Sequence, residues 1–246
     1  MTSRKSTEKD AFTVLNVWYV GKNPDLGFVP PNEFIKVAED IGLMPELGHY
    51  ITQTSLRQMA ELQQQLQQEF QVSINISLKQ FSQPYFFEEF IKVAEKSGVK
   101  LTNITIEVTE SLFIEDLNFI LGILHNFRKK GVSISLDDFG TGFSSLSLLR
   151  QLPIQELKID KAFVDDILTD DKDATLINNI IQIANDLGMY TVAEGVETLE
   201  QKKKLTSYGC ILYQGYYFAK PMGINDLKNF IRDIGNSNIN NSENNA

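Results

Sequence analysis

Residues 132–160 read VSISLDDFGTGFSSLSLLRQLPIQELKID and contain two short β-rich runs, SISLDDFG and ELKID. The first run ends near Asp137 and Asp138, and the second contains Lys158. From Val72 onward, similar runs alternate with longer amphipathic segments, a pattern typical of βα units that build a parallel sheet or barrel. The other runs are VSINIS, ITIEVTE, TVAEGVE and LYQGYYF.

The segments between these runs carry apolar residues at helical spacing, so we expect helices that pack on the outside of the sheet. An earlier helix is predicted around residues 34–41, and a longer one over about residues 46–68, where a Gln-rich face is typical of solvated surface. The six runs and the apolar stretch of residues 11–20 together give seven strands, whereas a closed barrel of this type needs eight. The clearest periodic sets are Leu117, Ile120, Leu121 and Leu124, and then Leu176, Ile180, Ala184 and Leu187.

The bulk properties of the chain exclude several classes of protein. A formal charge of −9 and a pI near 4.8 disfavour a nucleic-acid duplex or an anionic membrane surface as the main partner. A single cysteine, Cys210, excludes an intramolecular disulfide. Because the sequence has no signal-peptide core and no apolar run long enough to cross a bilayer, we expect a cytoplasmic protein. We expect one domain over residues 11–235, flanked by a disordered start (1–10) and a disordered Asn-rich tail (236–246).

Polar residues occur at almost every predicted strand end. Ligand sites of parallel α/β proteins form at the carboxyl ends of strands, so these residues are candidates for one site. Several carboxylates at one end of a barrel repel each other unless a cation neutralises them, and oxygen donors without histidine favour Mg²⁺ or Mn²⁺. The candidates are Asn75, Glu107, Glu110, Asp137, Asp138, Lys158, Glu194, Glu197 and Gln214.

Simpler interpretations of single residues remain open at this point. An isolated Glu at a strand end is more often a salt-bridge partner or helix cap than a metal ligand. Lys158 can be a counter-ion of these acids or can orient a metal-bound water, and spacing alone does not separate the two roles. A kinase-like interpretation of DDFG fails because the chain lacks a glycine-rich loop and an HRD segment. A glycosidase carboxylate pair is the third hypothesis, and the lysine disfavours it.

The order of the motifs adds a further indication. From about Pro24 to Leu227 the chain resembles an EAL-type cyclic-di-GMP phosphodiesterase domain. The resemblance implies a modified (β/α)₈ TIM-like barrel that binds two Mg²⁺ or Mn²⁺ ions and hydrolyses cyclic-di-GMP to linear pGpG. The motifs that carry it are NPDLGFVPPNEFIKVAEDIGL, SINIS, IEVTES, DDFGTGFSSLSLLRQLP, ELKIDKAFV, VAEGVET and QGYYFAKP.

The same resemblance implies a role for each candidate residue. Lys158 would hold or activate the nucleophilic water, Glu194 would complete the metal and water network, and Gln214 would position it. Glu197 would support these residues, and Glu110 would anchor the loop after Asp138, which in the family lies at a homodimer interface. The implied metal ligands are Asn75, Glu107, Asp137 and Asp138.

The N-terminal segment departs from the family pattern. It reads FTVLNVWYVGKNPDLG, which puts Asn16 at the position of the glutamate of the Glu-Ala-Leu motif and Val20 at that of a phosphate-binding arginine. The family's first strand and helix have no counterpart, so we expect a truncated or divergent start. Because Asn16 brings no negative charge, we expect weaker metal binding and impaired activity. The alternative is an inactive EAL-like receptor for cyclic-di-GMP or a protein-interaction module.

Overall fold

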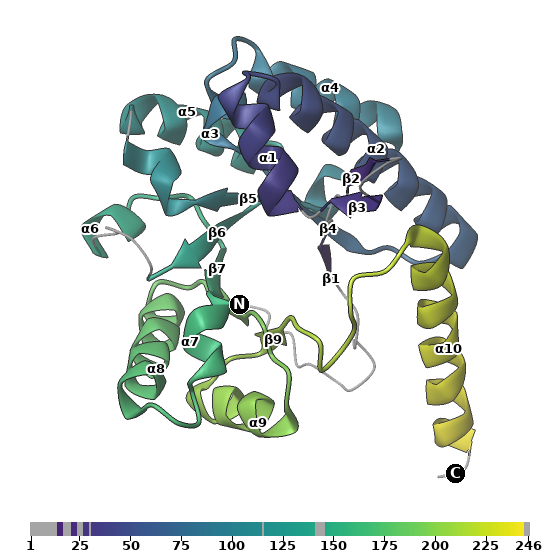
Figure 1. The fold of residues 1–246 in the computed structure, drawn as a ribbon, viewed down its shortest axis with the longest axis vertical. Helices are drawn as coiled ribbons and strands as arrows, with labels where there is room; N and C mark the ends of the chain where they lie inside the picture. Colours follow the sequence, from purple (N-terminus) through teal and green to yellow (C-terminus); the bar gives the residue numbers. More distant parts are fainter. Residues whose placement is uncertain are drawn as a thin grey trace.

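Seven parallel strands form one sheet in the computed structural model, which describes residues 14–16, 21–23, 27–29, 31–114, 116–140 and 146–243 (Figure 1). The strand order is that of the sequence, and in the described residues no pairing joins the two outer strands, β1 and β9. A short antiparallel hairpin of β2 (Gly21–Asn23) and β3 (Gly27–Val29) lies outside this sheet. The seven strands are β1 (Val14–Asn16), β4 (Gln71–Asn75), β5 (Ile104–Thr109), β6 (Ser133–Phe139), β7 (Glu156–Ile159), β8 (Tyr190–Ala193) and β9 (Leu212–Tyr213).

Helices follow the strands and surround the sheet (Figure 1). This arrangement confirms the predicted α/β class, in which parallel strands alternate with helices as in a TIM-like barrel. Two 3₁₀ segments, η1 (Leu101–Asn103) and η2 (Glu110–Ile114), flank β5. The helices are α1 (Pro31–Asp40), α2 (Met44–Leu66), α3 (Leu78–Phe81), α4 (Phe86–Ser97), α5 (Leu117–Lys129), α6 (Leu146–Leu149), α7 (Lys161–Asp165), α8 (Asp171–Asp186), α9 (Leu199–Tyr208) and α10 (Ile224–Glu243).

The structure describes parts of both ends of the chain, for which the sequence predicts a strand and two disordered segments. The apolar stretch of residues 11–20 contributes β1, which pairs with β4 in parallel. The disordered start predicted for residues 1–10 lies outside the described residues. Helix α10 runs to Glu243 and so includes residues 236–243 of the predicted tail, while the domain bounds stay a prediction.

Strand β5 shows how the sheet separates an apolar face from a polar face. Its sequence ITIEVT alternates strictly, and since successive side chains point to opposite faces, Thr105 and Glu107 share one face while Ile106 lies on the other. Ile106 belongs to the core cluster formed with the surrounding helices. The register aligns Glu107 with Asn75 on β4 and with Ser135 on β6. The polar face is therefore continuous across neighbouring strands.

A group of phenylalanines fixes α4 against α5. The Phe127 ring is fully buried, and its centroid lies 6.0, 5.0 and 5.2 Å from those of Phe86, Phe87 and Phe90. Each of the three contacts is edge-to-face, which is a favourable geometry for aromatic rings. These contacts hold the two helices that flank β5.

We expect Phe127→Ala to lower the free energy of unfolding by about 3–5 kcal/mol, because it leaves a large cavity among three rings. Urea unfolding followed by circular dichroism measures this loss. Phe119→Ala on the same helix is the matched control: Phe119 is 50% exposed, so its loss should be about 0.5 kcal/mol or less. Equal losses in the two variants would contradict the assigned packing.

Candidate functional site

Lys158 lies at the centre of the site, on β7. Its side chain is only 3% exposed, and its Nζ lies 2.9 Å from Glu107 Oε2, 3.1 Å from Asp137 Oδ2 and 2.6 Å from Glu194 Oε1. These three carboxylates come from β5, from β6 and from the residue after β8. The structure thus brings together four predicted site residues that are up to 87 positions apart, from 107 to 194.

One ammonium group cannot neutralise three carboxylates, and the pKa values reflect this imbalance. Burial by itself lowers the pKa of Lys158, but Glu107, Glu194 and Asp137 together outweigh it and raise the pKa well above the ordinary value. Burial raises the pKa of Glu194 to about 7, despite the nearby Lys158. Glu194 Oε1 thus forms an ion pair with Lys158 Nζ.

The two adjacent aspartates sit where β6 loses its regular geometry. The register with β7 shifts between Leu136 and Phe139, and Asp138 has a φ of 56°, which is rare for a residue with a side chain. The backbone N–H of Asp138 donates to Asp137 Oδ1 at 3.0 Å. Burial, followed by the charges of Asp137 and Asp160, raises the pKa of Asp138 to about 6. Strain of this kind gathers at functional sites.

Asn75 and Glu110 lie at neighbouring strand ends. Asn75 is the exposed last residue of β4 and is aligned in register with Glu107. Glu110 directly follows β5, and its Oε1 accepts a hydrogen bond of 3.1 Å from the backbone N–H of Gly140. Glu110 therefore holds the start of the loop that follows Asp138; residues 141–145 of that loop lie outside the described residues.

Gln214 and Asn16 belong to the two outer strands. The backbone N–H of Gln214, directly after β9, donates to Ala193 O at 2.8 Å, and its own carbonyl accepts from Val196 N at 3.0 Å. Asn16 ends β1 and is aligned with Ser73 on β4. The side chain of Asn16 lies outside what the structure describes, so only its place in the register is defined.

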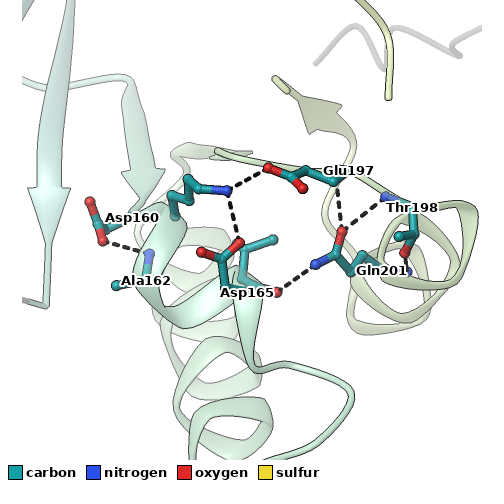
Figure 2. A network of polar contacts seen from close by, with 8 residues as sticks. Asp160, Ala162, Asp165, Glu197, Thr198 and Gln201 are labelled. Carbon is teal, nitrogen blue, oxygen red and sulfur yellow. Dashed lines mark hydrogen bonds and ion pairs between the residues drawn. The ribbon is translucent and has the colours of Figure 1, made fainter. Parts of the chain in front are cut away.

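Glu197 belongs to a separate network at the start of α7 and α9 (Figure 2). Its Oε1 lies 2.7 Å from Lys161 Nζ, which also lies 3.0 Å from Asp165 Oδ1. The backbone N–H of Glu197 donates to Gln201 Oε1 at 2.8 Å. The described contacts of Glu197 are thus with Lys161 and Gln201, whereas Glu107 and Glu194 contact Lys158.

Two further acidic residues were missed as candidates in the sequence. Asp160 accepts a hydrogen bond of 2.8 Å from Ala162 N as the N-cap of α7, and its charge helps to raise the pKa of Asp138. Glu156 is aligned in register with Ser135 on the polar face, and burial raises its pKa. The available signal for Asp160 was its place directly after β7; for Glu156 it was the two-residue spacing from Lys158 on one strand.

The donor chemistry of the site fits a hard divalent cation. All the candidate ligands offer oxygen atoms, and the carboxylates outnumber the one buried ammonium that faces them. In the described residues, no group of three His, Cys, Asp or Glu side chains already has the arrangement of a metal site.

Two surface hollows, of about 360 and 430 Å³, are lined by residues of α2, α4 and the segments that follow these helices. Neither includes a strand-end residue, so the candidate site rests on its chemistry and not on the shape of the surface.

No helix among the described residues is long and apolar enough to cross a membrane.

Comparisons with known proteins agree on one family. A family model described as EAL domain matches residues 6–221. The chain is 36% identical over 212 residues to the oxygen sensor protein DosP of Escherichia coli, which covers 86% of this chain and 26% of that protein. It is 34% identical over 211 residues to the cyclic di-GMP phosphodiesterase PA2567 of Pseudomonas aeruginosa, covering 86% of this chain and 36% of that protein.

A solved structure described as PaMucR phosphodiesterase in complex with c-di-GMP superposes with a TM-score of 0.82 at 32% identity, covering 86% of each chain. The similarity in fold therefore extends over most of both chains. The present chain spans only about a quarter to a third of the length of its curated relatives.

The raised pKa of Glu194 makes stability depend on pH. Between the ordinary value of 4.5 and about 7, the unfolded chain releases this proton while the folded chain retains it, so rising pH lowers the free energy of unfolding. Glu194→Gln lacks this titration. As the pH rises from 5 to 7 without metal, we therefore expect its free energy of unfolding to increase by about 1–2 kcal/mol relative to that of the wild type. Urea unfolding with a chelator measures this difference. Glu197→Gln is the exposed control, and an equal gain there would contradict the assignment.

Proposed function

This chain belongs to the EAL domain family, and from that premise we propose that it hydrolyses one phosphodiester bond of cyclic-di-GMP to give linear pGpG with a divalent metal ion. The observation that carries the proposal is the convergence of Glu107, Asp137 and Glu194 on the buried ammonium of Lys158. The relatives named for this activity support it, as does the solved complex of a relative with c-di-GMP.

The proposed metal ligands are Asn75, Glu107, Asp137 and Asp138, which would hold Mg²⁺ or Mn²⁺. Bound there, the metal supplies positive charge that makes water nucleophilic and stabilises the leaving oxygen. Because water is the nucleophile in this proposal, no nucleophilic side chain is needed.

The remaining residues would act on the water and its proton. Lys158 donates a hydrogen bond from Nζ that orients the attacking water. Glu194, which contacts Lys158, would complete the metal and water network and accept the water's proton. Gln214 fixes the position of the water, Glu110 holds the loop after Asp138, and Glu197 supports α9.

We further propose that catalysis is reduced by Asn16, which stands where the family has the glutamate of its Glu-Ala-Leu motif. An amide oxygen lacks the charge on which metal affinity in such sites depends. In this proposal residues 11–20 are a divergent version of the family's start. An EAL-like receptor that binds cyclic-di-GMP without hydrolysis, or an interaction module, is the second candidate, favoured by the same residue. A homodimer through the loop after Asp138 and a cytoplasmic location complete the proposal.

The direct test is mass-resolved conversion of cyclic-di-GMP by the purified chain, with Mg²⁺ and Mn²⁺ supplied separately. We expect linear pGpG, with Asp137→Asn at least a hundredfold slower because an isosteric amide removes a charged ligand. The control is Gln83→Glu, which replaces an amide by a carboxylate at an exposed position between α3 and α4. It should leave the rate unchanged. Saturable binding without product, from folded protein, would favour the receptor.

Restoring the missing charge tests the role of position 16. We expect Asn16→Glu to lower the Mn²⁺ concentration for half-maximal activity about tenfold, since an added carboxylate binds a hard cation more tightly than an amide. The activity is titrated with Mn²⁺ in both proteins. Asn23→Glu, at the end of β2 outside the main sheet, controls for the change in net charge. If both variants respond equally, Asn16 does not occupy a ligand position.

A further inference from the structure

The turn of residues 214–218 follows β9 and carries Gln214. Its backbone is bound to the segment after β8: Val196 N donates to Gln214 O and Tyr217 N donates to Val196 O, both at 3.0 Å. Gly215 has a φ of 155°, and a Cβ at this position would lie 2.2 Å from Val196 O. The turn therefore passes so close to the neighbouring backbone that only glycine fits.

Three aromatic rings at this turn lie near one lysine of α9. The Nζ of Lys202 lies 5.9 Å from the ring centroids of Tyr213 and Tyr217 and 5.6 Å from that of Phe218. The rings also contact each other: Tyr213 stacks on Phe218 at 6.1 Å, and Tyr217 meets Phe218 edge-to-face at 5.1 Å. An ammonium near aromatic faces is attracted by their negative potential, and several rings add to the effect.

Helix α9 is a fixed support for this lysine. Gln201, the residue before Lys202, is buried and closes a capping box with Thr198 at the start of the helix (Figure 2). Its Nε2 also donates to Val164 O of α7 at 3.1 Å. At the other end of the helix, Thr206 Oγ1 lies 2.7 Å from the hydroxyl of Tyr213. The helix is thus joined both to α7 and to β9.

We propose that Lys202 is a positioning residue: its ammonium, which lies near the rings of Tyr213, Tyr217 and Phe218, holds the turn of residues 214–218 against α9 and so fixes Gln214 at the site. The inference rests on the proposed function, which gives Gln214 its role. The two neighbouring lysines differ in this respect. Lys203 and Lys204 are exposed, and the ring near Lys204 is that of Tyr208 on the same helix.

Hydrogen–deuterium exchange tests the structural part without any enzyme assay. In Lys202→Ala we expect the amides of residues 214–218 to exchange about three- to tenfold faster, because the turn loses its cation while alanine preserves the helix. Lys202→Arg, which keeps the cation, should restore slow exchange. Lys203→Ala is the matched control. If Lys202→Ala exchanges no faster than the control, the proposal is wrong.

Steady-state kinetics with cyclic-di-GMP and Mn²⁺ test the consequence for Gln214. We expect Lys202→Ala to lower kcat about three- to tenfold and to leave KM within about twofold, since Gln214 is proposed to act on the water and not on substrate binding. Lys202→Arg should recover kcat. Faster exchange with an unchanged kcat would overturn the positioning role. If the wild type shows no turnover, the proposed function fails, whereas the exchange result still decides whether Lys202 holds the turn.

Discussion

The buried ammonium of Lys158 is the charge on which the arrangement of the site depends. Without it, Glu107, Asp137 and Glu194 would face each other near the carboxyl ends of the strands without the ammonium that they share. Breaking a buried ion pair by removing one partner is far more costly than losing a surface pair, because the remaining charge cannot be solvated. Lys158 therefore holds the three carboxylates together, and burial, the largest cause, raises the pKa of Glu194 to about 7 although the ammonium of Lys158 lowers it.

This arrangement follows from the alternation along the strands. On β5 the apolar positions pack with the helices, and Thr105 and Glu107 occupy the opposite face. The parallel register then carries that polar face to Asn75 on β4 and to Ser135 on β6. Barrel interiors are usually filled by branched apolar side chains. A polar face of this kind therefore has less apolar packing, and its side chains are available to form a site. The apolar core that compensates lies between the sheet and the helices.

Much of this could be predicted from the sequence, because the carboxyl ends of parallel strands meet at one edge whatever the detailed packing. That rule was sufficient to group Glu107, Asp137, Lys158 and Glu194. It could not assign partners to side chains outside that edge: the pairing of Glu197 with Lys161 joins the start of two helices whose relative position depends on the whole core. The aromatic surroundings of Lys202 are equally invisible in the sequence, since a lysine at the start of a helix usually faces solvent.

Protons and metal ions compete for the same oxygens in the proposed function. Asp138 has a pKa of about 6 and Glu194 one of about 7, so near neutral pH part of the negative charge of the metal-free site is held by protons. A divalent cation must replace those protons, and metal affinity consequently rises with pH. The attraction between the cation and each charged ligand offsets the free-energy cost of removing the protons. The neutral Asn16 at the edge strand contributes nothing to it, and for this reason one amide in place of a carboxylate is expected to weaken a site whose other donors are present.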